Sequence, residues 1–173
     1  MDLRYPIGEF KLEGQPSESQ HKQFISDIEQ APARLRGALA GLSEAQLETP
    51  YRPGGWTVRQ VAHHIPESHM NAYVRMKLAL TEDNPTIKPY DEARWAETPD
   101  VRGTPVAVSL ALLEALHQRW VVLLKALGPA DLARTFTHPE SGLWTIGRYV
   151  GLDAWHGKHH VAHITSLRQR MGW

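Results

Sequence analysis

Apolar side chains recur every three or four positions along four stretches of the chain, and this spacing places them on one face of an α-helix. The first stretch follows Ser17, the second runs from Thr57 to about Thr81, the third starts at Thr104, and the last runs from about Thr145 to Met171. Four long amphipathic helices joined by shorter connections are typical of a helix bundle. The pattern therefore predicts an all-α protein.

The ends of these helices carry recognisable signals. Thr57 followed three positions later by Gln60 matches a capping box at the start of the second helix. Thr104 followed by Pro105 predicts a cap and a first helical residue for the third helix. Gly172 is placed to end the last helix, because glycine readily adopts the left-handed conformation that closes a helix.

Prolines and long polar segments interrupt the helical pattern. Pro32 is expected to bend or divide the first helix, and Pro66 to kink the second and re-aim the side chains before it. The segment 82–103 contains three prolines and predicts a long loop with one helical turn near Trp95. Residues 129–142 read as another connection, and no segment makes a convincing strand.

Composition narrows the class of protein. The chain has 173 residues, 42% of them hydrophobic, which predicts one domain over residues 1–173. Lys plus Arg and Asp plus Glu number 19 each, with no basic stripe, so nucleic acid is not an expected partner. Neither a signal peptide nor an apolar run of membrane-spanning length is apparent, so we expect a cytoplasmic protein with no membrane partner.

Histidine is the residue type most able to carry chemistry here, since the chain has ten histidines and no cysteine. His156 and His160 lie four residues apart on the apolar side of the last helix, so both imidazoles should face the bundle interior. Such a pair suits zinc, copper, iron or nickel. A third ligand has to come from another helix. His69 lies within the apolar stripe of the second helix and His64 on its flank, and spacing leaves the choice open.

These residues also have structural interpretations. A single histidine on an apolar face is usually a hydrogen-bonded core residue, and two at this spacing make metal binding about as expected as that alternative. We expect His63, His138 and His159 at the surface or beside the ligands. Glu67, one turn after His64, could act as a general base or could hydrogen-bond a ligand's second nitrogen.

Several motifs in combination resemble the DinB-like superfamily and, within it, the YfiT (BstA) group of metal-dependent hydrolases. Members of that family place a metal-binding histidine eight residues after a Trp-Thr or Trp-Ser pair, which here relates Trp56 to His64. They end with a pattern that His156, His160, His163 and Gly172 match in register. Further similarity extends over YPIG (Tyr5 to Gly8), TPYR.GGWTVRQV (Thr49 to Val61), SHMNAY, KLALTE.NPTIKPY and AWHGKHH.AHI, and so over nearly the whole chain. The chain departs from the family after His64, where Ile-Pro-Glu replaces the common Leu-Ala-Asp.

The resemblance implies a DinB-type up-down-up-down four-helix bundle with one divalent transition metal, zinc or nickel, bound by His64, His156 and His160. It implies a metal-dependent hydrolase that acts on a small molecule through a metal-bound water, with Glu67 as the candidate base. Two alternatives also fit the resemblance. One is a metal-dependent S-transferase that uses a low-molecular-weight thiol such as bacillithiol, and the other is a non-catalytic metal-binding protein. A homodimer is expected in each case.

Overall fold

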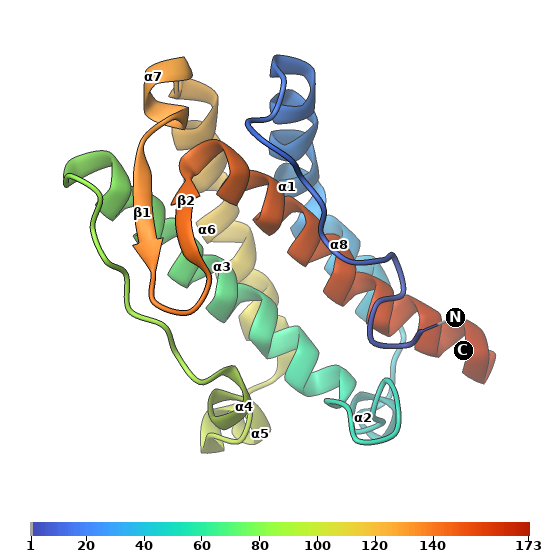
Figure 1. Ribbon diagram of the computed structural model, residues 1–173. Helices are drawn as coiled ribbons and strands as arrows, with labels where there is room; N and C mark the ends of the chain where they lie inside the picture. Colours follow the sequence, from blue (N-terminus) through green and yellow to red (C-terminus); the bar gives the residue numbers. More distant parts are fainter. Residues whose placement is uncertain (1) are drawn as a thin grey trace.

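Four long helices and a small hairpin make up most of residues 2–173, the part of the chain that the computed structural model describes (Figure 1). The long helices are α1 (Glu18–Leu39), α3 (Val58–Thr81), α6 (Val106–Ala126) and α8 (Ile146–Met171). Between them lie the short helices α2 (Glu44–Leu47), α4 (Glu92–Trp95), α5 (Pro99–Gly103) and α7 (Pro129–Leu132), and the strands β1 (Thr135–His138) and β2 (Gly142–Thr145). The predicted four-helix bundle is confirmed.

The directions of the long helices differ from the expected up-down-up-down alternation. Hydrogen bonds join His63 to Ser109 and His69 to His117, so residue numbers rise together along α3 and α6, and these two helices run parallel. Residue numbers also rise together along α1 and α8, where Lys158 donates to Asp27 and Arg168 to the Ala38 carbonyl, so these two helices run parallel as well. Each of α1 and α3 packs against both α6 and α8. The reason for the difference is the connection 82–105, which runs back along the bundle and returns the chain to the end where α3 began (Figure 1).

Helix ends follow the sequence signals with one exception. The Thr57 side chain accepts a hydrogen bond from the Gln60 N–H, and the Gln60 side chain accepts one from the Thr57 N–H, which completes the predicted capping box. Gly172 ends α8 with a left-handed φ of 71°. Thr104 does not cap α6; the backbone N–H of Thr104 closes α5 on the Asp100 carbonyl instead.

The two helical prolines lie inside continuous helices, so Pro32 does not divide α1. Proline has no N–H, and the carbonyl four residues before it therefore loses its intrahelical donor. For Pro32 that carbonyl belongs to Ile28, and it accepts a hydrogen bond from His117 of α6. The proline thus frees a backbone acceptor inside the bundle.

The connection before α8 contains the strands that the sequence pattern did not predict. Thr135 to His138 pair antiparallel with Gly142 to Thr145. The Ile87 N–H donates to the Thr137 carbonyl, which ties the hairpin to the long connection after α3. The strands are four residues each, too short for a period of two to stand out from the surrounding loop.

Two apolar clusters fill the bundle, one toward each end. The first is formed by residues such as Met76, Trp120 and Tyr149, and the second by residues such as Ile65, Leu113 and Ile164. Along α3, α6 and α8, five histidines whose rings contact one another lie between these clusters. We call them the histidine layer: His64, His69 and His117 are buried, and His156 and His160 are half-buried. Buried polar groups require partners, so the side chains of this layer are candidates for a binding or catalytic role.

Helix α6 is more apolar than the sequence analysis expected. Within residues 2–173, it alone has the length and composition that would suffice to cross a membrane, with a mean hydropathy of 1.4. In the structure α6 packs against α1 and α3 as a member of the bundle. Several apolar side chains on its outer face remain exposed, among them Val108, Leu112 and Val122.

Candidate metal centre

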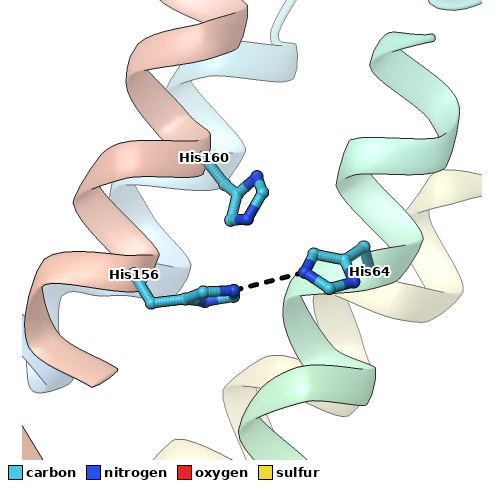
Figure 2. Close-up of side chains that lie close together, drawn as sticks. All are labelled: His64, His156 and His160. Atoms are coloured by element: carbon cyan, nitrogen blue, oxygen red, sulfur yellow. Dashed lines mark hydrogen bonds between the residues drawn. The ribbon is translucent and has the colours of Figure 1, made fainter. Parts of the chain in front are cut away.

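Three histidines from two helices converge at one side of the histidine layer (Figure 2). His64 comes from α3, while His156 and His160 come from successive turns of α8. One ligand nitrogen from each residue lies within 4.8 Å of the others. The Nε2 atoms of His64 and His156 are 3.2 Å apart. The structure therefore brings together the three residues that the family resemblance implies as ligands.

The geometry of the cluster fits a metal ion. Two nitrogens bound to one tetrahedral zinc ion at about 2.0–2.1 Å are separated by roughly 3.4 Å. The 3.2 Å between the His64 and His156 nitrogens is close to that value. The same distance also permits a hydrogen bond between the two rings, in which one nitrogen donates. Three imidazoles facing one point, with no acid among them, are a donor set suited to zinc or nickel.

Burial keeps these imidazoles neutral. Removal from water lowers the pKa of His64 to about 4. Burial, followed by the nearby histidines, lowers the pKa values of His156 and His160 well below the usual range. A neutral imidazole has one free lone pair, which is the form that binds metal. At neutral pH the cluster is therefore ready to act as a ligand set.

His69 occupies a different place from His64, although both face the interior. Its Nε2 lies 3.2 Å from Nδ1 of His156, and its Nδ1 lies 2.7 Å from Nε2 of His117. Both of its ring nitrogens are thus committed to other histidines. His64 joins the cluster and His69 supports one member of it from behind, a distinction that helical spacing left open.

A cavity of about 410 Å³ opens beside the cluster. Its wall includes all three histidines, together with Trp56, Arg75 and Tyr90. The Arg75 guanidinium donates hydrogen bonds to the Tyr149 hydroxyl and the Lys88 carbonyl. Arg75 thereby presents a fixed positive charge to a space large enough for a small molecule.

Residues 27–164 match the family model described as the DinB superfamily. The chain belongs to the DinB superfamily. A Bacillus mycoides relative named “Putative metal-dependent hydrolase” is 58% identical over 172 residues, which cover 99% of each chain. An Oceanobacillus iheyensis relative with the same description is 54% identical over the full length of both chains.

Solved structures support the same placement. YfiT from Bacillus subtilis, described as “a probable metal-dependent hydrolase with an unusual four-helix bundle topology”, has 48% identity and a TM-score of 0.97 over 100% of this chain and 99% of its own. TT2238, described as a four-helix bundle protein, has a TM-score of 0.59 at 20% identity, over 84% of this chain and 98% of its own, and shares the fold.

In this DinB-superfamily chain, Glu67 lies on α3 three residues after His64 and is not part of the cavity wall. Its side chain is half-buried on α3, and burial followed by the charge of Asp100 raises its pKa. The acids that do line the cavity are Glu92 and Asp153. The catalytic role expected for Glu67 stays a prediction.

Asp153 is the residue that the sequence reasoning missed. It precedes His156 by three positions on α8, the spacing of neighbours on one helix face, so periodicity alone could have found it. Its side chain is buried, and burial raises its pKa well above the usual range, which favours the neutral form of the carboxyl group. A neutral carboxyl group in a cavity wall can donate a hydrogen bond to a substrate oxygen.

Two of the three histidines expected at the surface or beside the ligands are buried. His63 is buried and its Nδ1 lies 2.7 Å from the Ser109 hydroxyl. His159 is also buried, with its ring stacked on Trp155, whereas His138 is partly exposed in β1. His63 and His159 directly adjoin ligands in sequence, so the helix carries them to neighbouring faces of the same buried layer.

Proposed function

We propose that this chain is a metal-dependent hydrolase whose divalent ion is bound by His64, His156 and His160. The observation that carries the proposal is the convergence of three imidazoles, one buried and two half-buried, at the edge of a cavity. Three protein ligands leave coordination positions open, as in catalytic rather than structural zinc sites. When bound, such an ion polarises a carbonyl and lowers the pKa of a coordinated water toward about 7. The names of close relatives support the same reaction class.

The cavity residues suggest how a small-molecule substrate is oriented. The Arg75 guanidinium offers hydrogen-bond donors, and so does the Asp153 carboxyl group in the neutral form that burial favours, so each suits a substrate oxygen. The Trp56 ring lies 4.7 Å from the His64 ring, between centroids, and forms an apolar wall next to the cluster. We propose Glu67 as general base, and its position one turn after His64 supports this role. The role requires a water molecule that relays the proton between the site and the carboxylate.

The decisive experiment combines metal analysis with a substrate screen. We expect the purified chain to contain about one zinc or nickel ion and to cleave an ester or amide in the screen with water alone. A chelator should abolish turnover, and added metal should restore it. A protein free of bound zinc and nickel that regains neither on incubation would contradict the proposal.

A second candidate is a thiol S-transferase, and a second cavity favours it. This cavity of about 350 Å³ shares Trp56 and His160 with the first, so space for two reactants meets at the cluster. Its wall includes Arg4 and Arg52, which suit the acidic groups of a thiol such as bacillithiol. A transferase requires added thiol for turnover, and Arg52→Gln should then raise the KM for the thiol while leaving bound metal unchanged.

We further propose that the protein is a cytoplasmic homodimer. The exposed apolar residues Val108, Leu112 and Val122 on α6 offer a surface that a second copy could cover. Light scattering at micromolar concentration should report about twice the chain mass of 19.5 kDa. A metal-binding dimer without catalysis is the third candidate, and inactivity of the metal-loaded protein toward electrophiles, with and without thiol, would favour it.

A further inference from the structure

Three histidines of the layer form a continuous hydrogen-bonded chain that spans the bundle. Nδ1 of His156 on α8 lies 3.2 Å from Nε2 of His69 on α3. Nδ1 of His69 lies 2.7 Å from Nε2 of His117 on α6. Nδ1 of His117 lies 2.6 Å from the carbonyl oxygen of Ile28 on α1. One residue from each of the four long helices therefore takes part.

The last link gives the chain a direction. A carbonyl oxygen can only accept, so Nδ1 of His117 carries the proton. A neutral imidazole carries a single N–H, which leaves Nε2 of His117 as the acceptor for Nδ1–H of His69. By the same reasoning, Nε2 of His69 accepts from Nδ1–H of His156. The lone pair of His156 is then on Nε2, the nitrogen that faces His64.

Pro32 makes this arrangement possible. In an uninterrupted helix the Ile28 carbonyl would accept from the N–H of residue 32, but proline has none. The carbonyl is thereby available to His117 in the interior. Gly157 opens space beside the middle histidine, because a Cβ atom there would lie 3.3 Å from Cε1 of His69. Gly157, which has no side chain, thus leaves room for His69, and Pro32, which has no N–H, leaves a carbonyl acceptor for His117.

We propose that His117 and His69 are positioning residues, which fix His156 in the tautomer whose Nε2 lone pair points at the metal. This inference rests on the metal site of the proposed function. Neither residue offers a free nitrogen to the metal, since the ring nitrogens of His69 and His117 are engaged in these hydrogen bonds. Partners of this kind orient a ligand and commonly contribute about 10–100-fold to metal affinity.

The test uses His117, because it lies two links from the ligand. His117→Leu removes both bonds, whereas His117→Gln keeps an amide donor for Ile28 and an amide oxygen for His69. His21→Leu is the matched control, because His21 is a buried histidine of α1 outside the chain. Zinc affinity is measured by competition with a chromophoric chelator. The tautomer of His156 is read from its ¹⁵N chemical shifts in the metal-free protein.

We expect His156 of the wild type to carry its proton on Nδ1, and His117→Leu to give a mixture of tautomers with zinc affinity lower by about 10–100-fold. His117→Gln and His21→Leu should retain zinc affinity to within about threefold. A proton on Nε2 of His156 in the metal-free wild type would overturn the inference, even if His117→Leu fails to fold. So would a loss in His117→Gln equal to that in His117→Leu with the tautomer unchanged. If the wild type binds no zinc, the proposed metal site fails, while the tautomer measurement still decides the hydrogen-bonded chain.

Discussion

The two sides of the histidine layer contain the same residue type, yet they differ in what lies beyond the rings. On the side of α3 and α8, His64 and His160 line a cavity. On the side of α1 and α6, His117 ends on the Ile28 carbonyl, which Pro32 deprives of its usual donor four residues later. Burial lowers the pKa values of all these imidazoles and so keeps them neutral. The group at the end of each side then decides whether an imidazole lone pair accepts a hydrogen bond or stays available to bind a metal ion.

The largest effect should come from removing a residue on the cavity side. His64→Ala deletes one of three ligands and should abolish stoichiometric zinc binding, a loss beyond the roughly 100-fold expected for a supporting partner. Metal content after dialysis is the measurement, and His159→Ala serves as the control, because His159 is buried on α8 but outside the cluster. Stoichiometric metal in His64→Ala would instead assign the third ligand to His69.

Glu67→Gln tests whether Glu67, which lies outside the cavity wall, acts as the general base for a reaction in the cavity. If Glu67 is the base, turnover should fall by roughly 10²-fold or more with metal retained. Asp153→Asn is the comparison, because Asp153 lines the cavity and Glu67 does not. Unchanged turnover and unchanged metal affinity in Glu67→Gln would remove the proposed base and favour thiol transfer.

Acid should destabilise the layer, and His117 on the side of α1 and α6 makes the sign clear. Burial lowers the pKa of His117 to about 4, whereas in the unfolded chain it is about 6.5. The unfolded state therefore binds the extra proton, so the stabilising contribution is complete above pH 6.5 and is lost as pH falls toward 4. Urea unfolding of metal-free protein between pH 7.5 and 4.5 should show this decrease. His117→Gln should reduce its slope by about one proton; an unchanged slope would show that His117 does not contribute.

The smallest effect concerns the space that holds His69. Gly157→Ala places a Cβ atom 3.3 Å from His69 and 3.5 Å from Ala31. Gly37→Ala is the matched helical control, because nothing lies within 4 Å of its Cβ position. In thermal unfolding the control should gain about 1 kcal/mol from helix propensity, and Gly157→Ala should gain less because His69 has to shift. Equal gains with equal zinc affinity would mean that the packing around His69 is not tight.

The sequence predicted the helices well because their ends are determined locally. The box of Thr57 and Gln60 and the glycine at position 172 act within one turn, and the structure has both. The direction of α6 could not be predicted in this way, since it depends on where the connection 82–105 leads the chain. The four-residue strands were missed because no periodicity develops over so few positions.

The candidate site was predictable in part for a similar reason. The shared face of His156 and His160 follows from spacing within one helix. The choice between His64 and His69 depends on which neighbouring helix each residue meets, which a single helical wheel does not contain. The carbonyl released by Pro32 was beyond sequence reasoning, because its acceptor role appears only when α6 packs against α1.

The connection after α3 also separates substrate preference from metal binding. Tyr90, Glu92 and Ala93 from this segment form part of the cavity wall, while the cluster is built from α3 and α8. Gln60 anchors the segment to α3 by donating to the Ala96 carbonyl and the Glu97 carboxylate. Substitutions or insertions between residues 88 and 94 could therefore alter the preferred substrate without disturbing the ligands. Proteins with this fold can therefore differ in substrate specificity while they keep the same metal ligands.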